Sequence, residues 1–291
     1  MPLPDPSSAI RHIKPRVREL SAYTLKHYEP RIKLNQNESP FDVPAELKGR
    51  LWERLPSRPW NRYPPFVATD FIGAVSEATG WPVDGILVGN GSNELIQALL
   101  AAVVEPGISV VVPEPTFTLY RLLTGVYGGT VVSVPLDDRL RFRVEALVEA
   151  AVAGNAAAIV LCTPNNPTGG SLTREEIEHI HDRTDALIVL DQAYVEFGGY
   201  DAIPLMAERP RIVVLRTFSK AMSMAGLRAG YLLGHPDLVR EISKAKLPYN
   251  INFVTETIAA EVLRHRHLLA DQVDLIRRER DRIVAELGAI P

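Results

Sequence analysis

The sequence predicts an α/β fold in three layers, with a mostly parallel sheet of about seven strands covered by helices on both faces. Two observations lead to this prediction. Short apolar runs alternate with helical patterns between residues 86 and 246, which is the order expected of parallel strands joined by crossover helices. The runs are also apolar at nearly every position, as expected of strands that are buried on both faces.

Strands and helices are expected in turn along this part of the chain. The apolar runs predict strands at residues 86–90, 108–113, 130–135, 156–164, 186–191, 211–216 and 227–234. Helical periodicity predicts helices at residues 92–104, 116–128, 143–154, 173–184 and 235–246. The helix at 173–184 has its own start signal, because Thr173 and Glu176 have the spacing of a capping box.

The two ends of the chain differ from this middle part. Residues 1–40 are rich in proline and charge, and they predict an arm that lies on another part of the protein. Beyond residue 250 the sequence is long, charged and helical, with no following strand. We therefore expect an arm (1–40), a large ligand-binding domain (41–249), and an interdomain helix with the start of a smaller C-terminal domain (250–291).

The composition excludes several classes of protein. Of 291 residues, 46% are hydrophobic and 23% are charged, as in globular proteins. The net charge of −3 gives no basic excess for nucleic acid. We see no secretory signal and no apolar segment of the roughly 18 residues that a membrane span needs, so a cytoplasmic location is expected. Cys162 is the only cysteine, and the histidines do not have metal-ligand spacing.

Three charged residues stand among apolar neighbours and need an explanation. Lys220 and Arg228 lie in TFSKAMSMAGLRAGY, and Asp191 ends the apolar run ALIVLD. Burying such charges without partners is costly. Taken alone, Asp191 could be a helix cap or part of an internal salt bridge. Taken together, the three residues point to a shared ligand, because residues that follow parallel strands meet at one edge of the sheet.

Pyridoxal 5'-phosphate is one ligand that satisfies all of these charges. A lysine in an apolar pocket can become a nucleophilic amine and form a Schiff base with its aldehyde. Asp191 would pair with its ring nitrogen. Its phosphate would lie between Arg228, Ser219 and the helix N-terminus at 91–93, where free N–H groups favour anions. Without this ligand, GNGSNE (89–94) is typical of an ordinary turn between a strand and a helix.

Five motifs in this order resemble the fold-type I aminotransferases that use pyridoxal phosphate. They are GNGSNE, PEPTFTLY, TPNNPTG, DQAY and SKAMSMAGLRAGY. The similarity extends from about residue 30 to residue 290. Within this group, IKLNQNESP, NRYPP and AGLRAGYLLG resemble the histidinol-phosphate aminotransferase branch most closely.

The resemblance implies a role for each matching residue. Lys220 would carry the cofactor and move the proton, and Asp191 would keep the ring nitrogen protonated. Phe117 would stack on the ring, while Tyr194 and Asn166 would bind its phenolic oxygen. The residues implied for the phosphate are Gly91, Ser92, Asn93, Ser219 and Arg228. Taken alone, Phe117 would be read as a core residue.

The resemblance also implies roles for two tyrosines, one at the neighbouring subunit and one at the substrate. Tyr63, in NRYPP, would reach the phosphate of the neighbouring subunit, so the resemblance implies a homodimer with a shared active site. Tyr23, in ELSAY, would contact the substrate, although packing of the arm explains it equally well. Family members continue beyond the point that matches residue 291, so we expect an incomplete small domain without the arginine that clamps the substrate.

The implied activity is transfer of an amino group to 2-oxoglutarate. Histidinol phosphate is the leading donor, and an aromatic amino acid is the second. Two other readings stay open on the same fold. One is decarboxylation of a phosphorylated amino acid. The other is a non-catalytic or truncated pyridoxal-phosphate-binding protein. The effector domain of a transcription regulator is disfavoured within this class, because residues 1–40 are too short and proline-rich for the winged helix that precedes such a domain.

Overall fold

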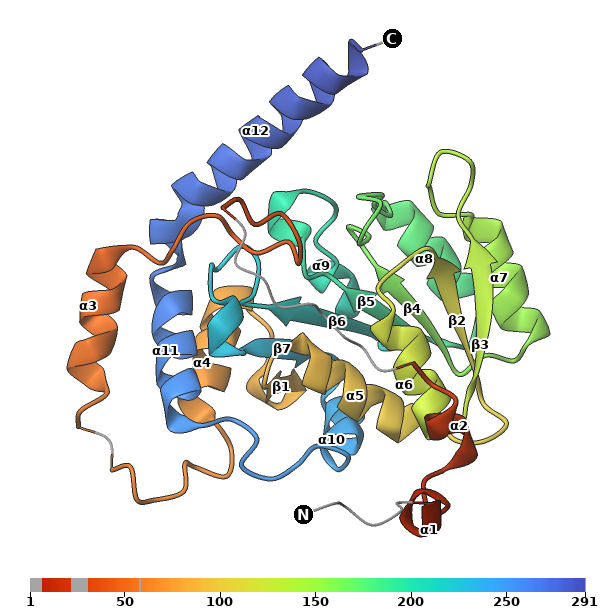
Figure 1. Cartoon of the computed structure of the whole chain (residues 1–291), viewed down its shortest axis with the longest axis horizontal. Helices are drawn as coiled ribbons and strands as arrows, with labels where there is room; N and C mark the ends of the chain where they lie inside the picture. Colours follow the sequence, from red (N-terminus) through yellow and green to blue (C-terminus); the bar gives the residue numbers. More distant parts are fainter. Residues whose placement is uncertain (1–6, 22–30, 58, 291) are drawn as a thin grey trace.

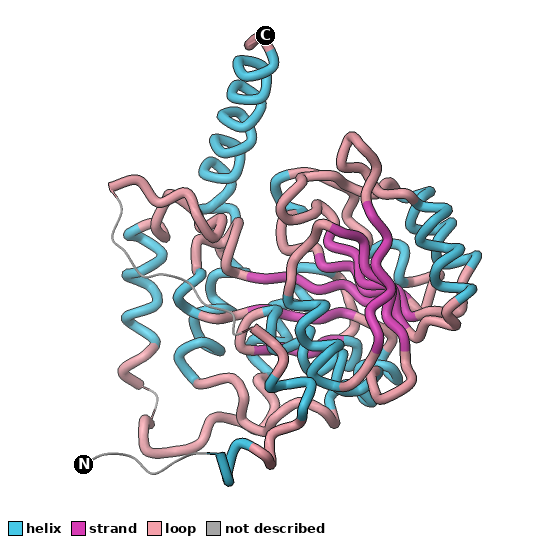
Figure 2. Tube along the Cα trace, turned by 45° about the vertical axis from the view of Figure 1, so that its right-hand side comes forward, coloured by secondary structure: helices cyan, strands magenta, loops and turns pink. Residues whose placement is uncertain are grey.

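The computed structural model describes residues 7–21, 31–57 and 59–290. A seven-stranded sheet crosses the molecule in the order β1-β7-β6-β5-β4-β2-β3, with helices on both sides (Figures 1 and 2). β7 runs antiparallel to both of its neighbours, β1 and β6, and the other strand pairs of the sheet are parallel. The predicted three-layer α/β fold is therefore confirmed. The strands are β1 (Ile86–Gly89), β2 (Ser109–Glu114), β3 (Thr130–Pro135), β4 (Ala158–Cys162), β5 (Leu187–Asp191), β6 (Ile212–Thr217) and β7 (Gly230–Leu233).

The side chains of successive strand residues pack in two separate apolar cores, because they alternate between the two faces of the sheet. Val110 and Val112 of β2 belong to one core, and Val111 between them belongs to the other. In β4, Val160 and Ile159 divide in the same way. The central strands are buried along their whole length, which explains why their sequences are apolar throughout.

Each core is closed by its own layer of helices. One layer consists of α5 (Ser92–Val103), α6 (Leu119–Tyr127) and α10 (Pro236–Ser243). The other core is covered by α3 (Ala45–Arg54), α4 (Thr69–Thr79), α7 (Val144–Ala153), α8 (Arg174–Arg183), α9 (Ile203–Met206) and α11 (Phe253–Arg264).

Two helix starts show how local hydrogen bonds set the boundaries. The predicted capping box of α8 is confirmed, since Thr173 Oγ1 accepts from the Glu176 amide and the Glu176 carboxylate accepts from the Thr173 amide. In contrast, α6 begins at Leu119, three residues later than predicted from 116. The reason is that Asn165 holds the preceding loop, accepting from Thr116 Oγ1 at 2.6 Å and donating to the Pro115 carbonyl at 3.0 Å.

The helical stretch beyond residue 250 is divided into two helices. A turn of 3-10 helix at Arg266–Leu269 separates α11 from α12 (Ala270–Gly288). The apolar face of α11 packs in the core, whereas none of the residues of α12 is buried. Leu269, in the turn, is 2% exposed. The chain therefore bends where its last core residue packs, and α12 extends away from the body (Figure 1).

The N-terminal region contributes two short helices, α1 (Ser7–Ile10) and α2 (Pro15–Arg18). Residues 31–40 form neither helix nor strand, and residues 34–38 of this segment line the cavity that is described below.

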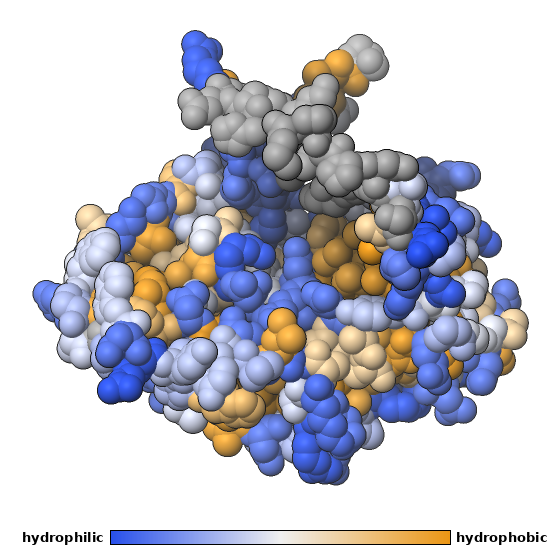
Figure 3. All heavy atoms as spheres, turned by 60° about the horizontal axis from the view of Figure 1, so that its bottom comes forward, coloured by the Kyte–Doolittle hydropathy of each residue, from blue (hydrophilic) through white to orange (hydrophobic). Residues whose placement is uncertain are grey.

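On the face drawn in Figure 3, hydrophobic residues appear in several places between hydrophilic ones. None of the helices in the described ranges is long and apolar enough to cross a membrane.

Candidate cofactor and active site

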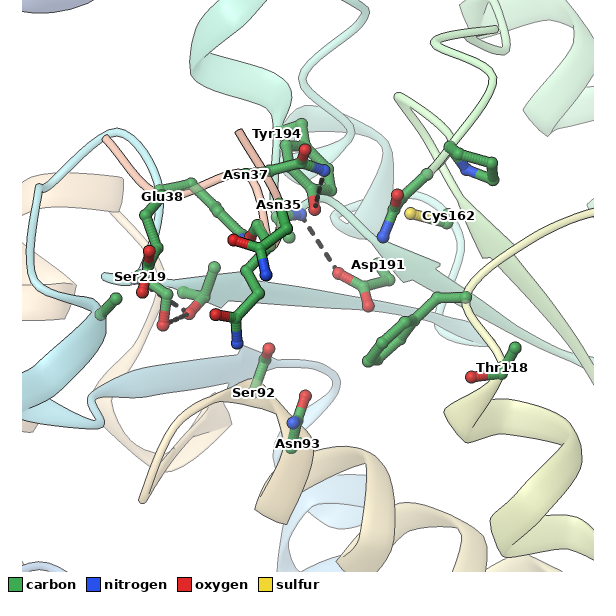
Figure 4. A pocket seen from close by; sticks show the side chains of 18 of the residues that line it. Asn35, Asn37, Glu38, Ser92, Asn93, Thr118, Cys162, Asp191, Tyr194 and Ser219 are labelled. Atoms are coloured by element: carbon green, nitrogen blue, oxygen red, sulfur yellow. Dashed lines mark hydrogen bonds between the residues drawn. The ribbon is translucent and has the colours of Figure 1, made fainter. Parts of the chain in front are cut away.

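A cavity of about 870 Å³ opens at the edge of the sheet where the parallel strands end. Its walls come from the segments that follow β2, β4, β5 and β6, from the N-terminus of α5, and from residues 34–38. In Figure 4, Asp191 lies in this cavity between Ser219 on one side and Cys162 on the other. Ligands of open α/β sheets bind at this edge, so the cavity is the candidate active site.

Asp191 is a buried carboxylate that faces the cavity. It is the last residue of β5 and is only 3% exposed. Its Oδ2 accepts from the Tyr120 hydroxyl at 2.7 Å, and its Oδ1 accepts from the Ala193 amide at 3.1 Å. Burial raises the pKa of Asp191, while these two hydrogen bonds act to lower that pKa. No cation of the described residues forms an ion pair with it, so a cationic ligand group would complete the site.

Lys220 brings an amine to the same cavity. It is half-buried three residues after β6, and its Nζ donates to the Gln36 carbonyl at 2.6 Å. The Nζ also lies 5.5 Å from the ring centre of Tyr194. Burial lowers the pKa of Lys220, the charge of Glu38 raises it, and the charge of Arg228 lowers it further. A lysine with a lowered pKa is a stronger nucleophile at neutral pH.

The phosphate candidates meet at one end of the cavity. Arg228 Nη1 donates to Ser219 Oγ at 3.2 Å and to the Ala225 carbonyl at 3.0 Å. Within the described part of the chain, Arg228 has no carboxylate partner. Gly91 lies against its guanidinium, directly before the first helical residue, Ser92. The arginine and the helix N-terminus together form a site for a dianion.

Three further predicted residues surround the space between Asp191 and Lys220. Tyr194 accepts a hydrogen bond from Asn37 Nδ2 at 3.2 Å, and its hydroxyl faces the cavity (Figure 4). Asn166 lines the cavity, whereas the side chain of its neighbour Asn165 is used to hold the loop. Phe117 also lines the cavity.

Of the two remaining predicted tyrosines, only Tyr63 lies in the described part of the chain. Tyr63 is 82% exposed and stacks on Tyr249, with ring centres 4.8 Å apart. It does not line the cavity of its own chain. Tyr23 lies outside the residues that the structure describes.

The sequence analysis missed several residues near the site. Asn37 and Glu38 line the cavity, although IKLNQNESP was used only as part of the resemblance. Tyr120 was treated as part of a helix. Arg277 and Arg280, in the charged helical stretch beyond residue 250, donate to the carbonyls of Glu196 and Phe197. The polar residues before Pro40 were the only indication in the sequence that Asn37 and Glu38 belong to the site. Their place in the cavity could not be predicted from that, because the other walls follow strands that are far away in the sequence.

The side chains present fit pyridoxal phosphate. A buried carboxylate without a cation suits a protonated ring nitrogen, and a lysine with a lowered pKa suits an aldehyde. Because Arg228 lies close to Gly91, a phosphate bound at this end of the cavity would face both a guanidinium and the free N–H groups of the helix N-terminus. A fold of this topology with this set of groups defines an enzyme that uses pyridoxal phosphate.

The chain belongs to the aminotransferase class I and II family, which it matches over residues 29–291. The predicted family and its cofactor, pyridoxal phosphate, are thereby confirmed. The chain is 40% identical over 283 residues to the histidinol-phosphate aminotransferase of Chlorobium phaeovibrioides, covering 97% of this chain and 79% of the relative. It is also 40% identical over 281 residues to the enzyme of the same name from Chlorobaculum tepidum, covering 96% and 81%.

The fold is also similar to that of a solved structure with the same name as these relatives. The histidinol-phosphate aminotransferase of Sinorhizobium meliloti, in complex with pyridoxal-5'-phosphate, superposes with a TM-score of 0.84 at 25% identity. The match covers 95% of this chain and 77% of that one.

Proposed function

We propose that this aminotransferase transfers the amino group of histidinol phosphate to 2-oxoglutarate, as a step of histidine biosynthesis. The observation that carries the proposal is the 40% identity over 97% of the chain to a relative that bears this name. The family match over residues 29–291 includes every segment that lines the cavity, among them residues 34–38 and the ends of β4, β5 and β6. Runner-up donors are aromatic amino acids, which would need the same groups around the cofactor.

Bound pyridoxal phosphate supplies an aldehyde that exchanges amino groups and a ring that withdraws electrons from the substrate. Asp191 holds a proton on the ring nitrogen through its carboxylate. Lys220 would hold the cofactor through its aldehyde, and its Nζ would carry the proton that moves during the reaction. The lowered pKa of Lys220 leaves part of the amine neutral and able to accept that proton.

The remaining cavity residues bind and orient the cofactor. Tyr194 and Asn166 would hydrogen-bond its phenolic oxygen, and Phe117 would pack on its ring. The residues that hold the phosphate are Gly91, Ser92, Asn93, Ser219 and Arg228. Tyr23 would reach the substrate from the arm.

The donor is proposed to enter through a second cavity of about 490 Å³. It shares Asn166, Tyr194 and Lys220 with the first cavity, so a ligand there reaches the reacting amine. Arg280 of α12 lies in its wall and provides a cation on that side, although its guanidinium also pairs with the Asp281 carboxylate at 2.7 Å. This arrangement suits a donor that carries a negative group at the end far from its amine.

We also propose a homodimer in which Tyr63 serves the site of the partner. Its 82% exposure and its stacking on Tyr249 leave the hydroxyl available to another subunit. The neighbouring Trp60 and Phe66 are 77% and 66% exposed, which is unusual for large apolar side chains. Mixing Tyr63→Ala and Lys220→Ala subunits should restore activity, because each hybrid contains one site with both residues intact. Hybrids without activity would argue against a shared site.

The function is tested by comparing donors at a fixed concentration of 2-oxoglutarate and measuring glutamate. We expect kcat/KM to be highest for L-histidinol phosphate and clearly lower for L-histidinol, which lacks the phosphate. Higher kcat/KM for L-phenylalanine would favour the aromatic reading. Release of carbon dioxide from a phosphorylated amino acid, without glutamate, would favour decarboxylation. Cofactor binding without turnover of any donor would favour the non-catalytic reading.

A further inference from the structure

We propose that Tyr120 is a positioning residue for the reaction, whose hydroxyl orients the Asp191 carboxylate and keeps it ionised. This inference rests on the proposed function only where that function assigns Asp191 to the ring nitrogen. It adds a residue from a different element, the first turn of α6, to the machinery of the site.

The geometry of the pair is that of a buried hydrogen bond to a carboxylate. Tyr120 is 0% exposed and Asp191 is 3% exposed. The hydroxyl lies 2.7 Å from Oδ2, which is a typical O–H···O distance. The other carboxylate oxygen accepts from the Ala193 amide. Each oxygen therefore has one fixed protein donor, and the carboxylate cannot rotate without breaking both bonds.

Tyr120 also supports the wall of the cavity. Its ring meets Phe117 edge-to-face, with ring centres 5.6 Å apart and an angle of 86° between the planes. Phe117 is the side chain expected to stack on the cofactor. A single buried tyrosine thus contacts both the carboxylate and the aromatic side chain that would hold the ring.

Four titratable groups face Asp191, and only Tyr120 is suited to stabilise its charge in the bound state. Burial raises the pKa of the Cys162 thiol, which donates to the Pro164 carbonyl instead. The Tyr194 hydroxyl accepts a hydrogen bond from Asn37 Nδ2. Lys220 is the only cation of the four, and it is assigned to the aldehyde. Burial, followed by the Asp191 charge, raises the pKa of Tyr120, so its hydroxyl remains a donor across the working pH range.

The test measures the affinity for pyridoxamine 5'-phosphate as a function of pH. This probe has the ring nitrogen and the phosphate but no aldehyde, so its binding does not require Lys220 to react. Acidification weakens binding once Asp191 becomes protonated. The Tyr120 hydrogen bond lowers the pKa of Asp191, so Tyr120→Phe should move this loss of affinity to higher pH. At neutral pH the affinity should fall about tenfold or more, as for loss of a hydrogen bond to a charged group.

Matched variants separate positioning from simple packing. Tyr231→Phe removes a hydroxyl from another buried tyrosine, outside the cavity wall, and should leave the pH profile unchanged. Replacing Tyr120 by 3-fluorotyrosine keeps the ring and strengthens the donor, so the profile should move to lower pH. This second variant decides the question if Tyr120→Phe folds poorly.

A double variant provides the sharpest comparison. If Tyr120 acts through Asp191, then adding Tyr120→Phe to Asp191→Asn should change the affinity by less than twofold. An unchanged pH profile in Tyr120→Phe, or an additive loss in the double variant, would overturn the proposal. These measurements use no amino donor, so they remain valid if histidinol phosphate proves to be the wrong substrate.

Discussion

The guanidinium of Arg228 lies directly against the backbone of Gly91. A Cβ atom at residue 91 would be 2.5 Å from Arg228 Nη2, and the φ of 82° is in the left-handed region. Arg228 itself has a φ of 59°. Such backbone conformations are rare for non-glycine residues and concentrate at functional sites. Here they bring a cation and the N-terminus of α5 to the same end of the cavity.

Gly91→Ala should therefore weaken cofactor binding. The added methyl group displaces Arg228 and strains the backbone by about 1–3 kcal/mol, so we expect the dissociation constant for pyridoxal phosphate to rise roughly tenfold. Fluorescence titration of the apoprotein measures this change. Gly73→Ala, in α4 with open space around the added Cβ, is the control. Equal affinity of the two variants would argue against a phosphate site at Gly91.

Asp191→Asn should lower the transamination rate by much more than it lowers cofactor affinity. The amide keeps the shape of the side chain but removes the charge that holds a proton on the ring nitrogen. Breaking a buried ion pair costs about 3–5 kcal/mol, so we expect the transamination rate to fall by roughly two to three orders of magnitude. Asp271→Asn, on the exposed first turn of α12, serves as the control. A near-normal rate in Asp191→Asn would remove Asp191 from its assigned role.

The reaction of Lys220 with pyridoxal phosphate should have its pH midpoint below that of an ordinary lysine. Because burial lowers the pKa of Lys220, the neutral amine becomes available below the ordinary lysine value of 10.5. The rate of covalent attachment should rise as pH increases through this lowered pKa. Glu38 raises the pKa of Lys220, so Glu38→Gln should move the midpoint to still lower pH. Stopped-flow absorbance measures it, with Glu46→Gln as the control. A midpoint that moves upward would contradict this electrostatic account.

The elements that the sequence predicted well are those with a strong local signal. The apolar run of β6 and the capping box of α8 are both set by nearby residues. The late start of α6 was not predictable in this way. It depends on Asn165, which is 49 residues from Thr116 in the sequence. Long-range hydrogen bonds of this kind override helical periodicity.

The candidate site shows the same division. Lys220, Asp191 and Arg228 stood out because charged residues in apolar surroundings require partners. Tyr120 gave no such signal, since a tyrosine on an amphipathic helix is common. Its role depends on the packing of α6 against the end of β5, which brings together residues 71 positions apart. Asn37 was hidden for a similar reason, because its partner Tyr194 is 157 positions away.

The cap of α8 offers a test of stability away from the site. Thr173→Ala removes the acceptor for the Glu176 amide, so we expect a loss of about 1 kcal/mol in the free energy of unfolding. Urea denaturation followed by circular dichroism measures the difference. Thr173→Ser retains the hydroxyl and should stay close to the original stability. If Ala and Ser were equally stable at this position, the cap would not contribute.

Lys220 and pyridoxal phosphate are proposed to act together on histidinol phosphate in this cavity. The most direct measurement reconstitutes the chain with pyridoxal phosphate, adds L-histidinol phosphate, and follows the visible absorption band of the lysine-bound cofactor. We predict that the band bleaches as pyridoxamine phosphate forms, and that Lys220→Ala never shows the band. A wild-type band that does not respond to this donor, or a band that persists in Lys220→Ala, would contradict the account.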